Sequence, residues 1–454
     1  MIRKLLRIGI ILGCLLSPFL LWRLWLRHDI NTRLAAIRQA GLPTNGKELN
    51  EWYQAMPDNR NAALVLTQAF ALITNYPDAR SNQIWNFKIP TANRQIEPDM
   101  LDLLAGFVEM NSAVVAKANE ALELPGCRYP ADFTLLANTP LPHLAKLNTL
   151  ATINAYTSIL ALDRGQFPRA SEATEKILAL ARTLDAEPCA ISQLVRLKLF
   201  KMALTCLERR LTAGALIEPE LSGLEKAFGR MTITNGIITA LIGERAWVGA
   251  YFQLSKAEAE RLSPAANQSS DTERGPFIPS RGPVILRLSG FYDLDFGQFL
   301  LTMNTNITLA ARSPREQLKA AAYFQRAGEH SSKRYRTVSA TTLPLFSGTL
   351  VRGVDAQAFL SMAMTGLAIE RFRNEHHQFP ETLEELVPTH FPEVPVDPFS
   401  RESDALQYKR TEQGYVLYSI GRDQKDDGGL EETDKKKSND GTSFDLVFRV
   451  GAKK

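Results

Sequence analysis

The sequence lacks the short motifs that mark the common catalytic sites. It contains no G-x-S-x-G, no HExxH, no G-x-x-x-x-G-K-[ST] and no G-x-G-x-x-G. His376 and His377 are adjacent, so on a helix they point about 100° apart and cannot chelate one metal from one face. We interpret this pair as a solvated helix end. His143 has no carboxylate nearby in the sequence, so we expect a helix-start or packing residue rather than a base.

The chain also lacks a strong charge imbalance. Its 53 basic and 49 acidic side chains give a formal net charge of +4 over 454 residues, and no arginine-rich or aromatic-interleaved stripe occurs. We therefore expect no nucleic-acid partner. The 45% apolar content is sufficient for sizeable cores, and the length predicts two or three domains of about 150 residues each.

Cysteine is scarce, with four in the whole chain. Cys127, Cys189 and Cys206 show no CxxC spacing and no companion histidine, so a structural zinc site is not expected. Cys127 and Cys189 both lie beside prolines at predicted helix ends, where an oxidising compartment can pair them. Unpaired buried thiols are the alternative that we favour.

The N-terminus carries a long uncharged run at residues 8–22, preceded by basic side chains. Trp22 and Trp25 stand where aromatic side chains favour a membrane interface. The run is shorter than the roughly 20 residues that span a bilayer, but Arg7 and Arg23 can snorkel and extend the apolar length. We predict a single-pass anchor over residues 1–30.

Two alternatives apply to this segment. A cleaved secretory signal has the same basic start and apolar core, but no small-x-small cleavage site follows the run. The residues before Cys14 also look like a lipoprotein processing site, although the apolar residues 15, 16 and 19 would then replace the usual polar tether. We favour an uncleaved anchor, with Cys14 as a small membrane-facing residue.

Residues 31–260 are expected to form an α-helical body. Apolar residues recur there at helical spacing, and prolines or glycines separate the periodic segments. The predicted helices span residues 33–40, 61–74, 98–122, 144–163, 168–185, 190–211, 219–228 and 237–254. This pattern predicts an irregular bundle or a degenerate helical repeat.

Gly165, Phe167 and Ala170 have the G-x-[FY]-x-x-A spacing of a tetratricopeptide-type helical hairpin. The glycine permits a tight turn with positive φ, the aromatic ring fills the groove, and the alanine allows close helix approach. The segment resembles one such repeat, but no second copy follows after about 34 residues. We therefore expect antiparallel helices joined at residues 163–168, without a full solenoid.

Helical periodicity stops at residues 263–283, where Ser, Pro, Gly and charged residues cluster. We interpret residues 261–350 as a linker with additional helices at residues 296–312 and 314–327. Residues 331–350 are rich in Ser and Thr and give no clear pattern. A tail domain is expected over residues 351–454.

The tail has the order helix, proline-punctuated loop, β-hairpin and acidic glycine loop. Its predicted helix spans residues 355–374, and the loop contains Phe379-Pro380, Leu386-Val387-Pro388 and Val394-Pro395-Val396-Asp397-Pro398. This order resembles the globular domain of the major pseudopilin of bacterial type II secretion. The resemblance covers about a fifth of the chain and implies a small α+β fold. It does not imply filament assembly, because the N-terminal segment lacks the glutamate that pseudopilins carry at the fifth mature position.

Several carboxylates follow the predicted tail strand that ends at residue 420. Calcium takes six to eight oxygen ligands at flexible geometry, which an acidic loop with glycines can supply. The pseudopilin resemblance implies a calcium ion held by an aspartate after the Ser-x-Gly step and another near the chain end, and these correspond to Asp423 and Asp445. We predict a calcium site at Asp423, Asp427 and Asp445. The inserted lysines at 435–437 oppose a cation, so a solvated acidic and basic loop is the alternative.

These observations predict a mainly α protein with an N-terminal transmembrane helix, a helical body and a small pseudopilin-like α+β C-terminal domain. We expect a membrane-anchored protein of the bacterial cell envelope that acts as a non-enzymatic interaction or scaffold module with protein partners, linked to secretion. The tail resemblance places the body outside the cytoplasm. The alternative function is an extracytoplasmic hydrolase with a site in the helical body. A deep pocket holding two carboxylates, or a histidine with a shifted pKa, would favour that alternative.

Overall fold

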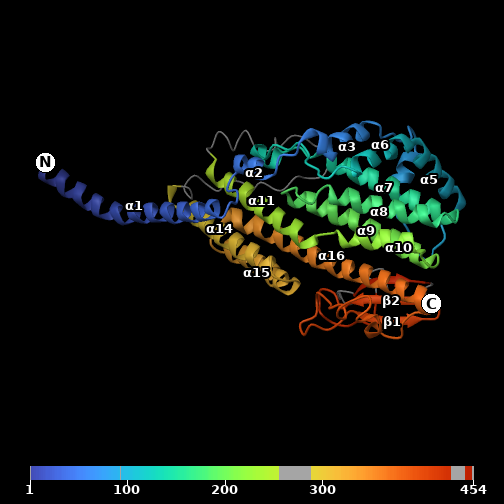
Figure 1. The fold of residues 1–454 in the computed structure, drawn as a ribbon. Helices are drawn as coiled ribbons and strands as arrows, with labels where there is room; N and C mark the ends of the chain where they lie inside the picture. Colours follow the sequence, from blue (N-terminus) through green and yellow to red (C-terminus); the bar gives the residue numbers. More distant parts are fainter. Residues whose placement is uncertain (1, 93, 255–287, 431–444, 452–454) are drawn as a thin grey trace.

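The computed structural model describes residues 2–92, 94–254, 288–430 and 445–451, with the side chains of the first helix described from residue 16. This part of the chain is mainly helical and contains a small three-stranded sheet (Figure 1). The α-helices are α1 (Ile2–Gln39), α2 (Gly46–Trp52), α3 (Ala62–Ala71), α4 (Arg80–Asn86), α5 (Pro98–Met110), α6 (Ser112–Leu122), α7 (Pro142–Asp163), α8 (Phe167–Arg182), α9 (Ala190–Thr212), α10 (Glu218–Gly229), α11 (Ile233–Gln253), α14 (Phe291–Ala310), α15 (Pro314–Ser332) and α16 (Thr337–His376). Short 3-10 helices are η1 (Asp58–Arg60), η2 (Phe133–Asn138) and η3 (Leu383–Leu386), and the strands are β1 (Gln407–Thr411), β2 (Gly414–Ser419) and β3 (Leu446–Val450). The predicted loop at residues 263–283 lies outside the described residues.

Helix α1 has two parts with different surroundings. Its N-terminal part extends away from the body, and its C-terminal part lies against α14 (Figure 1). The buried residues Leu26, Ile30, Leu34 and Ile37 share one helix face at helical spacing and pack into the core. Among the described residues, no helix is long and apolar enough to cross a membrane. The predicted anchor run at residues 8–22 begins within the segment whose side chains are not described.

The three helices predicted over residues 144–163, 168–185 and 190–211 correspond to α7, α8 and α9. Each contacts the next, and α7 also contacts α9 (Figure 1). Gly165 occupies the turn between α7 and α8 with φ +67°, a conformation that favours glycine over residues with a Cβ. The predicted turn and its antiparallel helices are therefore confirmed.

The single helix predicted over residues 98–122 is wrong, because the chain bends at Asn111 and forms α5 and α6. The Asn111 side chain is fully buried. Its Oδ1 accepts a hydrogen bond from the backbone N–H of Thr74, and its Nδ2 donates to the Thr74 and Phe107 carbonyls. These bonds join the bend to the end of the α3 segment, so a tertiary contact overrides the helical pattern.

Helix α16 is longer than the predicted helix at residues 355–374 and includes the segment 337–350 that gave no clear pattern. It packs against α9, α10, α11, α14 and α15 and then against the sheet (Figure 1). Pro344 lies inside the helix and faces Gly328 of α15, where an added Cβ would lie 2.5 Å from the proline ring. Since α16 is continuous through residue 351, it joins the body to the tail without a break in secondary structure.

The tail is an antiparallel sheet in the order β1-β2-β3, with Leu417 of β2 opposite Tyr408 and Phe448. The central strand β2 is buried along its whole length. The Tyr415 hydroxyl donates to the Gly366 carbonyl of α16 at 3.1 Å, and the Phe448 ring packs where a side chain at Gly366 would lie. The absence of a side chain at Gly366 therefore lets the sheet approach the helix closely.

Candidate functional site

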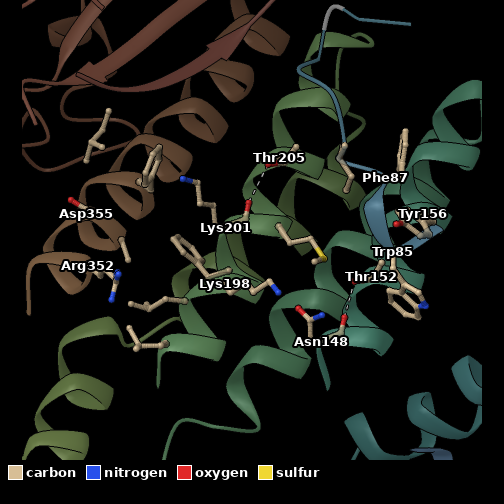
Figure 2. A pocket seen from close by; sticks show the side chains of 18 of the residues that line it. Trp85, Phe87, Asn148, Thr152, Tyr156, Lys198, Lys201, Thr205, Arg352 and Asp355 are labelled. Atoms are coloured by element: carbon tan, nitrogen blue, oxygen red, sulfur yellow. Dashed lines mark hydrogen bonds between the residues drawn. The ribbon is translucent and has the colours of Figure 1, made fainter. Parts of the chain in front are cut away.

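A cleft of about 1100 Å³ crosses the exposed face of α9. In Figure 2, Lys198 and Lys201 of α9 lie in the middle, with Arg352 and Asp355 of α16 on one side and Trp85, Phe87 and Tyr156 on the opposite side. Helix α7 forms part of the same wall, and tail residues close the cleft next to α16. A smaller hollow of about 200 Å³ shares several of these residues and continues between α9 and β3. The site is therefore built by the body and the tail together.

Apolar and cationic side chains line the cleft together. On α9, Leu194, Leu197, Lys198 and Lys201 stand at positions i, i+3, i+4 and i+7, which places them on one side of the helix. The Lys201 ammonium lies 5.6 Å from the ring centroid of Phe359, close enough for a cation–π contact. The site therefore offers apolar area and positive charge over the same surface.

The two carboxylates that line the cleft already have partners. The Arg422 guanidinium donates to Asp355 from Nε at 3.0 Å and forms a second, shorter contact from Nη2. Asp445 accepts hydrogen bonds from the backbone N–H groups of Gly429 at 2.7 Å and Asp427 at 3.4 Å. Burial raises the pKa of the Asp445 carboxyl, and the two N–H groups partly offset this rise.

Asn148 of α7 places an unusual polar atom in the cleft wall (Figure 2). Its side-chain Oδ1 is buried and has no hydrogen-bond partner among the described residues. One turn further along α7, Thr152 donates its hydroxyl hydrogen to the Asn148 main-chain carbonyl at 2.8 Å, so this hydroxyl does not satisfy the side-chain oxygen. A buried acceptor without a donor costs free energy unless a ligand or water supplies the hydrogen bond.

The structure brings two of the three predicted calcium ligands together through the main chain. Asp445 holds the turn at residues 427–429 through N–H groups, whereas Asp423 accepts from the backbone N–H of Lys425 at 3.2 Å. In the part of the chain that the structure describes, no three acidic, histidine or cysteine side chains are grouped as a metal site requires. The inserted loop at residues 431–444 lies outside that part. The visible role of Asp445 is thus to fix the loop.

His143 has a carboxylate partner that sequence reasoning missed. Its Nε2 lies 2.9 Å from Oε2 of Glu187, and the Tyr129 ring stacks on the imidazole at a centroid distance of 4.0 Å. Ser192 donates to the other oxygen of Glu187 at 2.7 Å. All of these side chains are buried and none lines the cleft, so the group fastens α7 to the turn between α8 and α9.

The cysteines and the remaining predicted histidines occupy structural positions. Cys127, Cys189 and Cys206 are unpaired thiols, and burial raises the pKa of Cys127 and Cys206 to about 12. His376 stacks on Phe372 in the last turn of α16, and His377 is the C-cap residue with φ +58°. The interpretation of this histidine pair as a helix end is confirmed.

The cleft itself gave no signal in the sequence. Its residues come from α4, α7, α9, α16 and the tail, and no short motif connects them. The nearest signal was the occurrence of Lys198 and Lys201 on an otherwise apolar helix face. A search of family models, of curated proteins and of solved structures finds no match to this chain.

Proposed function

We propose that this chain is a membrane-anchored protein of the bacterial cell envelope that acts as a non-enzymatic interaction or scaffold module. The observation that carries the proposal is the projecting part of α1 (Figure 1). Several of its apolar side chains are more than half exposed, at 53% for Leu16, 57% for Leu20, 66% for Leu21, 62% for Leu24 and 60% for Trp25. A contiguous exposed apolar surface of this kind is typical of a site that contacts a membrane or another protein.

The body is held firmly to this helix. Arg23 forms an ion pair with Asp293 of α14 at 2.6 Å, and burial of the α1 face begins at Leu26. Leu288 and Phe291, on either side of Gly290 at the start of α14, are also exposed, and Gly290 lies against Trp22 and Arg23 of α1. The apolar surface therefore continues from α1 onto the body, which supports a body seated close to the membrane surface.

The chemistry of the cleft supports binding over hydrolysis. The hydrolase alternative needs an acid or base that is free to transfer a proton. Both cleft carboxylates, Asp355 and Asp445, are already engaged by donors, and His143 lies buried outside the cleft. The tail extends the proposal to a pseudopilin-like module linked to secretion and holding calcium. That part rests on the residue pattern and on the order of a long helix followed by an antiparallel sheet.

Liposome flotation of the full chain tests the anchor. We expect the wild type to float with the liposomes and the triple variant Leu20→Glu, Leu21→Glu, Leu24→Glu to remain in the dense fraction, because charge in the apolar layer is costly.

The matched control carries three glutamates at exposed leucines of the body, Leu64, Leu72 and Leu345. This control should float like the wild type. Flotation of the α1 variant, or failure of the wild type to float, contradicts the proposal.

A further inference from the structure

The cleft carries positive charge that the described residues do not neutralise. Lys198, Lys201 and Arg352 line it, and none of them forms an ion pair within the described part of the chain. The carboxylates of the same cleft are taken by Arg422 and by backbone N–H groups. Clefts lined by one sign of free charge attract ligands of the opposite sign. The ligand of this site should therefore be anionic.

Apolar side chains surround these cations. Trp85, Phe87 and Tyr156 stand beyond the lysines in Figure 2; the Trp85 side chain is 39% exposed, Phe87 is half-buried and Tyr156 is buried behind them. Phe359 lies on the α16 side. Exposed aromatic rings beside charged groups are typical of interface positions that hold a partner's apolar side chains. An anionic ligand with apolar groups between its charges fits this arrangement.

Asn148 distinguishes between a peptide and a lipid. Its buried Oδ1 needs a hydrogen-bond donor, and the side-chain amide can also donate from Nδ2. A peptide group supplies one N–H and one C=O, so it can pair with both ends of this amide. An acyl chain has no donor, and α9, which the cleft crosses, lies away from the projecting end of α1 (Figure 1).

We propose that the cleft over α9 binds an extended acidic segment of a partner polypeptide, with aromatic or aliphatic side chains between its carboxylates. This inference rests on the proposed function and gives the partner its chemistry. Acidic side chains of the segment pair with Lys198, Lys201 and Arg352. Its apolar side chains pack on the aromatic wall, and one of its peptide groups bonds to Asn148.

Fluorescence anisotropy with the full chain in detergent tests this inference. The probe is a short fluorescein-labelled peptide in which Glu and Phe alternate. One comparison peptide replaces Glu by Lys, and a second replaces Phe by Ser. We expect binding of the first peptide only, weakening as salt is raised because the charges are exposed.

The variants Lys198→Glu with Lys201→Glu, and separately Asn148→Leu, should each weaken binding about tenfold or more. The matched charge reversal Lys226→Glu with Lys333→Glu, at exposed lysines outside the cleft, should leave the affinity unchanged. Thermal melting of each variant shows whether it is folded. Lys198→Gln with Lys201→Gln provides a milder test should the reversal unfold the chain.

Three results would overturn the inference. Equal binding of the acidic and lysine-containing peptides removes the charge argument, and unchanged affinity in a folded Lys198 and Lys201 variant removes the site. Binding of anionic phosphatidylglycerol vesicles through these lysines, without peptide binding, assigns the cleft to lipid. Liposome flotation through α1 is independent of all three, so failure of this inference is distinguishable from failure of the anchor.

Discussion

Replacing Glu244 by Gln should stabilise the body at neutral and alkaline pH. Glu244 of α11 is 6% exposed, and its Oε1 accepts the backbone N–H of Ala190 at the start of α9 at 2.9 Å. The neighbouring Arg245 does not neutralise it, because that guanidinium donates to Asn304 and to the Pro43 carbonyl. Burial raises the pKa of Glu244 to about 7, and the Ala190 N–H only partly offsets this.

The sign of the effect follows from proton linkage. Below the ordinary pKa of 4.5, Glu244 is protonated in both the folded and the unfolded chain, so it costs nothing. As the pH rises from 4.5 to 7, the unfolded chain releases the proton first and stability falls. Each pKa unit corresponds to about 1.4 kcal/mol, so a rise from 4.5 to about 7 costs about 3 to 4 kcal/mol at most. Glutamine keeps the acceptor oxygen for Ala190 and carries no charge.

Urea unfolding at pH 5 and pH 8 measures the effect. We expect Glu244→Gln to unfold at higher urea than the wild type at pH 8 and at similar urea at pH 5. Asp295 and Glu370, whose pKa values burial raises to about 6 and about 7, should preserve a smaller pH dependence in the variant. Glu51→Gln, at an exposed glutamate, serves as the control. The reasoning is refuted if wild type and variant lose the same stability between the two pH values.

Three further outcomes are expected. Gly165→Val should lower stability by about 1 kcal/mol or more through backbone strain, since Gly165 has φ +67° and no atom lies within 4 Å of the added Cβ. Gly229→Ala, also in open space but without positive φ, should not lower stability. Equal melting temperatures of the wild type and Gly165→Val would argue against strain. Asn148→Leu should melt at or above the wild-type temperature, because it removes an unpaired buried acceptor, and a loss exceeding about 1 kcal/mol would mean that this oxygen has a partner. The full chain should melt higher in calcium than in chelator, and Asp423→Ala should abolish the difference; identical melting of the wild type in both leaves Asp445 as a loop cap alone.

Local patterns predicted the helices whose ends are set by local chemistry. The turn at Gly165 followed by Pro168 was recognisable because glycine permits positive φ and proline suits the first turn of a helix. The bend at Asn111 could not be recognised from the sequence, because the backbone groups that hold it belong to Thr74, 37 residues away. Helix α16 was truncated in the prediction because its first half is rich in Ser and Thr and contains Pro344, which Gly328 of another helix accommodates.

The candidate site was less accessible to sequence reasoning than the fold. The pairing of His143 with Glu187 joins residues 44 positions apart, and the cleft joins five segments. Which side chains become partners depends on which are buried together, and that is set only when the helices have packed. The acidic tail loop could be predicted as a candidate site because its carboxylates are close in sequence. Lys198 and Lys201 of α9 could not be predicted as site residues, since exposed lysines on a helix are common.

An environment-sensitive dansyl amino acid, genetically encoded at residue 21 or residue 205 of the full chain in liposomes, tests the membrane-anchored module directly. Leu21 belongs to the projecting part of α1, and Thr205 lines the cleft without being one of its cations. We expect blue-shifted emission at residue 21 that lipid-attached nitroxides quench. At residue 205 we expect emission that these quenchers leave unchanged and that the acidic peptide alters. Emission at residue 21 typical of water, or quenching by lipid at residue 205, would contradict a membrane-anchored module with a cleft facing water.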